Sequence, residues 1–207
     1  GTPYFGTDLT YKGNESHILA TQNPETVCKN FINENKEFFK LQAPLNELIR
    51  KRFTIDPQGK KHIVFSQYYM EIPIWGKELA VHLEQNNQVY MFNGRFVPTP
   101  VDLDVKAISV GKSEAVDIVI EDMKKNGIYA ILSEQQAEMM RYDQPVVEKY
   151  IKYDDDGNPR LAWFVNIITS FFDNWFYFVD CKTGGIIEKY NATITDGPTT
   201  AFAKDYH

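Results

Sequence analysis

The feature that most constrains this fold is a change in the spacing of apolar residues, from helical to alternating, that occurs twice along the chain. Asn23-Pro24-Glu25 supplies a capping residue, a proline at the first helical position and an acid in the first turn. Apolar residues at near-helical spacing follow as far as Leu41. The pattern then alternates with a period of two, which predicts strands at 52–55, 62–70, 75–83 and 88–92. A helix followed by such a meander is an α+β unit.

The segment Val97-Pro98-Thr99-Pro100 is the best boundary, because two prolines in four residues cannot continue a central strand. Beyond it, Ser109 is a candidate cap for a second helix, which ends at Gly127. Further strands are predicted at 145–153, 160–170, 175–180 and 186–190. We therefore predict an α+β chain of two tandem units, each an antiparallel β-meander packed on one or more helices. The predicted domains are 1–98 and 99–192, followed by a tail at 193–207.

Charge and composition exclude several classes of function. The 207 residues include 22 Lys and Arg against 28 Asp and Glu, a net charge of −6. That balance argues against general phosphate binding, so we expect no nucleic-acid partner. No apolar run approaches the ~18 residues of a membrane span, so we expect no membrane partner. The chain begins at Gly1 without Met, so a removed targeting segment stays open.

The residues that could carry chemistry form no catalytic pattern. The histidines are His17, His62, His82 and His207, and none lies three or four residues from another, as a helical metallohydrolase would need. Cys28 and Cys181 form no CxxC motif, and both a disulfide between them and two buried thiols stay open. We expect no catalytic residue, no metal ligand and no cofactor in this chain.

The aromatic segment 171–178 has two interpretations. Its alternate members belong to the core of a sheet, or the whole segment forms a sticky surface that binds a partner. His82 lies in a predicted strand between apolar neighbours, where a histidine bonded to the backbone is expected rather than a metal ligand.

Two stretches resemble known propeptide domains. Residues 62–82 read HIVFSQYYMEIPIWGKELAVH and resemble the strand pair of the fungalysin/thermolysin propeptide domain, and Asn93-Gly94-x-Phe96 continues the match. Residues 175–187 resemble the end of a PepSY domain. Glu71 departs from the family, which usually has Gly there, and Cys181 stands where the family usually has Ala. The matching positions, expected to be structural, are His62, Gln67, Tyr69, Pro73, Gly76, Glu78, His82, Asp180, Thr183 and Gly184.

The resemblance implies a propeptide of a thermolysin-like metalloprotease, built from units of the cystatin-like or PepSY-like fold. Such prosegments act as intramolecular chaperones and inhibitors, so the implied partner is a thermolysin-like zinc metalloprotease domain that this chain does not contain. The implied location is secreted, periplasmic or extracellular. The segment expected to contact the protease is Tyr190, Asn191, Ala192, Thr193, Ile194, Thr195 and Asp196. The alternative is a stand-alone secreted module of the same domains that binds a protein or ligand, with the aromatic cluster as its site.

Overall fold

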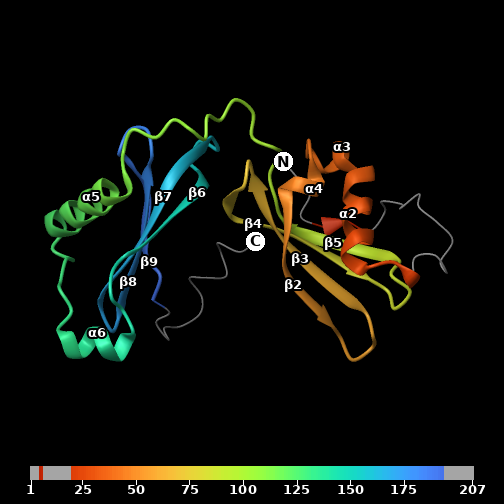
Figure 1. Ribbon diagram of the computed structural model, residues 1–207, viewed down its shortest axis with the longest axis horizontal. Helices are drawn as coiled ribbons and strands as arrows, with labels where there is room; N and C mark the ends of the chain where they lie inside the picture. The colour runs from red at the N-terminus through yellow and green to blue at the C-terminus, as the bar shows by residue number, and fades with distance from the viewer. Residues whose placement is uncertain (1–4, 7–19, 194–207) are drawn as a thin grey trace. The chain divides into compact units, whose positions relative to one another are not determined.

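The computed structural model describes residues 5–6 and 20–193 of the chain (Figure 1). The chain divides into two compact units: residues 1–105 with 150–153 and 157–159, and residues 106–149, 154–156 and 160–207. Each unit combines helices with mainly antiparallel strands. The predicted α+β class is therefore confirmed.

Among the described residues, three helices precede the main strands of the first unit. They are α2 (Pro24–Glu34), α3 (Lys36–Phe39) and α4 (Pro44–Glu47). The Asn23 side chain accepts a hydrogen bond from the Glu25 backbone N–H at 2.9 Å, as the capping pattern predicted. The expected single helix to Leu41 is wrong, because Asn35 interrupts it. The Asn35 side chain donates to the Phe31 carbonyl at 2.7 Å and so closes the last turn of α2.

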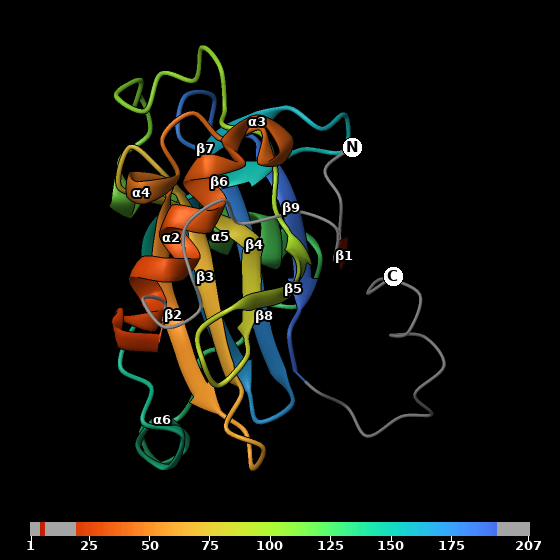
Figure 2. The ribbon, with the colours of Figure 1, turned by 90° about the vertical axis from the view of Figure 1, so that its right-hand side faces the viewer.

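An antiparallel sheet completes the first unit. Its strands are β2 (Leu48–Ile55), β3 (Lys61–Tyr69), β4 (Ile72–Leu83) and β5 (Val89–Arg95), and β1 (Phe5–Gly6) pairs with β5. Neighbours along the chain pair with one another from β2 to β5. The three helices lie together on one side of these strands (Figures 1 and 2). The core between them consists of Val27, Cys28, Phe31, Ile32, Phe39, Leu41, Leu48, Ile63, Phe65, Leu79, Val81, Leu83, Phe92 and Phe96.

The second unit follows a similar plan. Helices α5 (Lys112–Lys125) and α6 (Glu134–Met140) precede β7 (Pro159–Ser170), β8 (Asp173–Asp180) and β9 (Ile186–Asn191). Strand β6 (Val146–Tyr153) lies beside β7 in the strand order β6-β7-β8-β9. Helix α5 is capped by Gly111 and not by Ser109, because the Glu114 side chain reaches back to the Gly111 backbone N–H at 3.3 Å. Its apolar side packs on Val165, Tyr177 and Val179 of the sheet.

Both cysteines are buried and unpaired. Burial raises the pKa of the Cys28 thiol far above its ordinary value, and the nearby Glu25 carboxylate raises it further. Burial also raises the pKa of Cys181 to about 12, again with a nearby carboxylate, Asp180, acting in the same direction. Of the two alternatives, the structure therefore shows two thiols that are inert at neutral pH. None of the described helices has the length and apolar character to cross a membrane.

Candidate functional site

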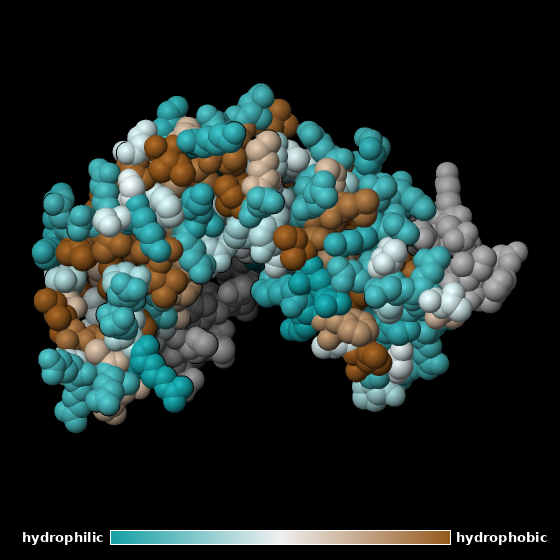
Figure 3. All heavy atoms as spheres, in the orientation of Figure 1, coloured by the Kyte–Doolittle hydropathy of each residue, from teal (hydrophilic) through white to brown (hydrophobic). Residues whose placement is uncertain are grey.

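One face of the first unit's sheet lies away from the helices and carries mostly polar side chains. We call it the open face. Residues opposite each other on paired strands point to the same side of a sheet. The cross-strand partners therefore place on this face Arg52, Thr54, His62, Val64, Ser66, Glu78, Ala80, His82, Met91, Asn93 and Arg95. Figure 3 shows apolar patches separated by hydrophilic residues on the side of the molecule that it draws.

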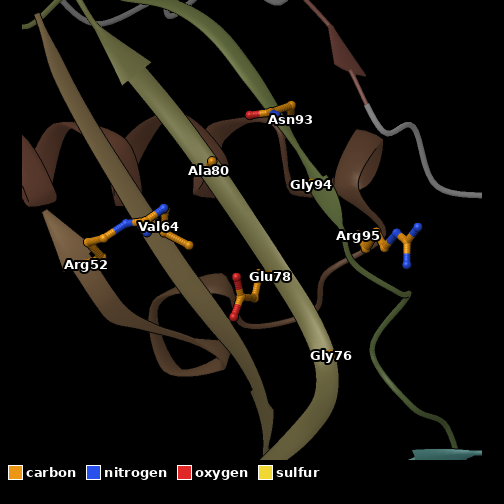
Figure 4. Close-up of a pocket in the computed structure, with 8 residues that line it drawn as sticks. All are labelled: Arg52, Val64, Gly76, Glu78, Ala80, Asn93, Gly94 and Arg95. Atoms are coloured by element: carbon orange, nitrogen blue, oxygen red, sulfur yellow. The ribbon is translucent and has the colours of Figure 1, made fainter. Parts of the chain in front are cut away.

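The open face contains a hollow of about 260 Å³. Figure 4 shows it with the helices behind the strands. One residue of the lining, Gly94, must be glycine. A Cβ at this position would lie 2.3 Å from the Glu78 carbonyl oxygen. Strands β4 and β5 can approach this closely only if residue 94 has no side chain. The hollow is lined by Arg52, Val64, Gly76, Glu78, Ala80, Asn93, Gly94 and Arg95.

The charges around the hollow are predominantly positive. Lys51 donates to the Glu78 carboxylate, which neutralises the one acid of the lining. Arg52 and Arg95 are the basic residues of the lining. The open face therefore suits a partner that presents carboxylates.

Two histidines of the propeptide motif face each other on the open face. The Nδ1 atoms of His62 and His82 are 2.7 Å apart. The Nε2 atom of His82 lies 2.7 Å from Asn93 Oδ1, and that of His62 lies 3.3 Å from Asp56 Oδ2. A hydrogen bond between the two Nδ1 atoms needs a proton on one of them and a lone pair on the other. If both Nδ1 atoms were protonated, two N–H donors would face each other and repel. The expectation of a backbone-bonded His82 is wrong, because its side chain joins this network.

Gln67, a third motif position, is buried and holds the chain where it leaves the sheet. Its amide nitrogen donates to the Val97 carbonyl at 2.7 Å, and its amide oxygen accepts from the Val97 N–H at 3.0 Å. The side chain thus satisfies the backbone of Val97 as a neighbouring strand would. Buried Glu47 acts nearby, accepting a hydrogen bond from the Thr99 hydroxyl at 2.6 Å.

The turn between β3 and β4 contains the family departure noted above. Met70 and Glu71 both have positive φ, at 47° and 66°. The backbone conformation that a glycine would favour is therefore kept although Glu71 occupies the site. Tyr69 lies opposite Ile72 and Pro73 opposite Tyr68, so both motif residues flank this turn.

The motif positions of the second unit form the turn between β8 and β9. Asp180 Oδ1 accepts hydrogen bonds from the backbone N–H groups of Lys182 and Thr183, each at 2.9 Å. The Thr183 hydroxyl accepts from the Gly185 N–H at 3.2 Å, and Gly184 has a φ of 73°. These side chains therefore shape the hairpin turn between the two strands.

The segment expected to contact the protease is only partly described. Tyr190 and Asn191 end β9, and Ala192 and Thr193 continue it along the first residues of β8. The expected contact residues Ile194, Thr195 and Asp196 lie outside the described residues.

The aromatic segment divides between the two faces of its sheet. Trp175 and Tyr177 pack towards α5. Phe176 and Phe178 lie on the other face, where both rings contact Phe164, with centroid distances of 4.9 and 5.4 Å between the rings. The exposed members are Phe171 and Phe172, in the turn between β7 and β8.

Sequence reasoning did not single out the basic residues of the open face or the polar contacts at the end of β9. Alternation within 52–55 puts Arg52 and Thr54 on the same side of the strand. With the strand pairing known, Arg52 would then have been placed opposite Val64. For the end of β9, the signal was Asn191-x-Thr193 directly after a strand, a pattern typical of side chains that bond the backbone two residues away. Among the described residues, no three His, Cys, Asp or Glu side chains gather into a group that could hold a metal ion.

Comparison with known proteins agrees with the motif. A family model described as Fungalysin/Thermolysin Propeptide Motif matches residues 46–96. Neutral protease B of Bacillus subtilis (strain 168) is 32% identical over 189 residues, which cover 87% of this chain and 32% of the relative. Thermolysin of Alicyclobacillus acidocaldarius subsp. acidocaldarius is 26% identical over 200 residues, covering 92% of this chain and 33% of the relative. The chain thus spans about a third of the length of these relatives.

Among solved structures, the Bacillus megaterium YpeB C-terminal domain matches 91% of this chain and 69% of its own, with 11% identity and a TM-score of 0.30. A score of this size supports no argument on fold or function. The motif and the sequence relatives together confirm the resemblance to the propeptide of a thermolysin-like metalloprotease, and they support a propeptide role.

Proposed function

We propose that this chain, whose residues 46–96 match the propeptide motif, is the prosegment of a secreted zinc metalloprotease of the thermolysin type. In this proposal it acts as an intramolecular chaperone and as an inhibitor. The observation that carries the proposal is that the matched motif falls on β2 to β5, the strands that build the open face. The motif thus coincides with a preformed surface on which another molecule can fold.

The chaperone role requires a surface that is ordered before its partner. The open face meets this need because a continuous core fixes its strands from behind. Arg52 and Arg95 on this face supply positive charge for carboxylates of the partner. A rigid template offsets part of the entropy that a protease with many long-range contacts loses on folding.

The inhibitory role is assigned to the end of the chain. In this assignment, residues 1–98 are the propeptide-motif domain, 99–192 a PepSY domain and 193–207 a junction tail. The segment from Tyr190 to Asp196 lies towards the protease cleft and blocks substrate. The turn formed by Asp180, Thr183 and Gly184 supports the PepSY assignment, because these are the positions at which the sequence resembles that domain.

This chain performs no chemical step in the proposal. It binds the protease domain, and the zinc and the catalytic residues belong to that partner. Both act outside the cytoplasm, as the secretion of such proteases requires.

An inhibition assay tests the proposal. The whole chain is added to a purified thermolysin-like protease, and hydrolysis of a short peptide is measured while a gel follows the intact chain. We expect inhibition at micromolar concentration or below, before the chain is cleaved. Loss of activity only in proportion to the chain's own cleavage would show a competing substrate and contradict the proposal. No effect on the protease would favour the stand-alone binding module.

A charge reversal tests whether the open face takes part. Arg52 lies on this face, whereas Lys36 lies on α3, behind the sheet, and both side chains are exposed. Arg52→Glu should weaken inhibition several-fold, and Lys36→Glu should leave it unchanged. Equal effects of the two substitutions would show that only net charge matters.

A further inference from the structure

The chain beyond β9 is held by the first two residues of β8, through the backbone of Asn174 and the side chain of Asp173. The Asn174 backbone N–H donates to the Thr193 hydroxyl oxygen at 2.9 Å and to Asn191 Oδ1 at 3.2 Å. The Ala192 N–H donates to the Asn174 carbonyl at 2.6 Å. Asn191 Nδ2 donates to Asp173 Oδ1 at 2.8 Å, and Asn191 Oδ1 accepts from the Thr193 N–H at 3.0 Å. We call Asp173, Asn174, Asn191 and Thr193 the exit clamp.

The exit clamp begins where regular pairing stops. The last paired residues of β8 and β9 are Trp175 and Asn191. Past this point the side chains of Asn191 and Thr193 supply acceptors that a continued strand would have supplied from its backbone. The clamp therefore extends the ordered path of the chain beyond the end of the sheet.

The two residues of β8 that receive the chain, Asp173 and Asn174, are themselves held by β7. The Ser170 hydroxyl donates to Asp173 Oδ2 at 2.7 Å. The Asn166 side chain donates to the Asn174 side chain, which ties the start of β8 to the middle of β7. Because both partners are fixed from β7, Ala192 and Thr193 are held against a rigid part of the sheet.

Apolar burial does not explain this arrangement. Asn191 is exposed, and Ala192 and Thr193 are only partly buried and outside the hydrophobic core of the unit. The terminal residues of an edge strand ordinarily fray when nothing packs on them. The hydrogen bonds of the exit clamp thus fix the direction of the chain at residues 191–193 and add nothing to the hydrophobic core.

We propose that the exit clamp sets the point and direction from which the chain leaves the second unit, and so positions the following residues for the protease cleft. This inference rests on the proposed inhibitory function. A segment held in place loses less conformational entropy when it binds than one on a flexible tether. Releasing the clamp should therefore weaken inhibition without unfolding the sheet.

Thr193 offers a matched test, because Val has the shape of Thr but lacks its hydroxyl. In the full chain, Thr193→Val should raise the inhibition constant for a thermolysin-like protease about 3- to 10-fold, the effect of losing one hydrogen bond. Thr193→Ser keeps the acceptor and should restore inhibition to near the wild-type value. Both variants should keep the melting temperature of the parent chain, because neither touches the core.

Thr183 provides the control within the same pair of strands. Its hydroxyl also accepts a backbone N–H, but in the turn at the other end of β9. Thr183→Val should leave the inhibition constant unchanged. Equal inhibition by the wild type and Thr193→Val would overturn the inference and leave the proposed function standing, as would equal weakening by the Thr193 and Thr183 variants. A wild-type chain that does not inhibit would overturn the proposed function and this inference with it.

Discussion

The two glycines that line the hollow are required for different physical reasons. Gly94 is fixed by contact, because a Cβ there would meet the Glu78 carbonyl oxygen at 2.3 Å and the Leu79 Cα at 2.9 Å. Gly76 has no atom within 4 Å of its would-be Cβ and is fixed only by its φ of 65°. Contact with rigid backbone cannot be relieved by a rotamer change, whereas an unusual φ costs a limited amount of free energy.

Alanine substitutions separate the two cases. Gly94→Ala should lower the free energy of unfolding by about 2 kcal/mol or more, because β4 and β5 must move apart. Gly76→Ala should lower it by only about 1 kcal/mol, the cost of an L-residue in the left-handed region. Urea unfolding of both variants measures the difference. A smaller loss for Gly94→Ala than for Gly76→Ala would contradict the close approach of the strands.

The histidine pair predicts how stability depends on pH. Burial lowers the pKa of His82 and the charge of His62 lowers it further, while the hydrogen bond to Asn93 acts in the opposite direction. In the unfolded chain, His82 is protonated as the pH falls below ~6.5, whereas in the folded chain it is protonated only at a lower pH. Stability from this group is complete above that pH and is lost as the pH falls towards the folded pKa.

Substitution of His82 tests that dependence. The free energy of unfolding should fall as the pH drops below ~6.5 in the wild type, and His82→Gln should flatten this fall. Asp56, whose pKa is lowered by hydrogen bonds that outweigh its desolvation, acts in the same direction but only below pH ~4. Urea titrations above pH ~5 therefore isolate the histidine. An unchanged slope in His82→Gln would show that the pair does not control stability.

At the scale of elements, the sequence predicted the helices and strands that have a regular apolar pattern. It did not predict the places where such a pattern is interrupted or missing. The predicted strand at 62–70 is observed as β3 (Lys61–Tyr69), whose alternate residues Ile63 and Phe65 belong to the core. The break between α2 and α3 escaped prediction, since it depends on a single side-chain bond from Asn35 to Phe31. Helix α6 has no buried residue, so the apolar periodicity that reveals a helix was missing there.

The candidate site was predictable only in part, for a related reason. His62 and His82 were noted in the motif, but their contact depends on the register between β3 and β4. That register contains a shift between Ser66 and Tyr68 that alternation alone does not reveal. The exit clamp likewise depends on residues 17 to 19 positions apart in the chain.

Gln67 shows how one side chain completes an element. It pairs with both backbone groups of Val97, so Gln67→Leu would leave a partly buried donor and acceptor without these partners. The free energy of unfolding should fall by about 2 kcal/mol. Gln85→Leu is the matched control, because that amide bonds the Gln58 carbonyl in an exposed turn, and it should cost less than about 0.5 kcal/mol. Similar losses in urea unfolding would contradict the special role of Gln67.

At the scale of the whole molecule, each unit has its own core. In each unit, side-chain hydrogen bonds also hold the chain where it leaves the sheet. Gln67 and Glu47 hold residues 97–99 after the last strand of the first unit, and the exit clamp holds residues 191–193 at the end of β9 in the second. A molecule that must present a surface and a chain end to a partner needs both to be ordered before binding. The ordered open face and the ordered chain end are the physical basis for proposing that this chain acts as a prosegment.

Calorimetric titration of the whole chain into a purified thermolysin-like protease tests that assignment most directly. With the cleft open, we predict a one-to-one complex with a dissociation constant at or below about 1 μM, a binding free energy of about −8 kcal/mol. With the cleft filled by a small active-site inhibitor, binding should weaken at least several-fold, because the segment after β9 loses its place. Absence of binding in both titrations, or equal binding in the two, would contradict the account.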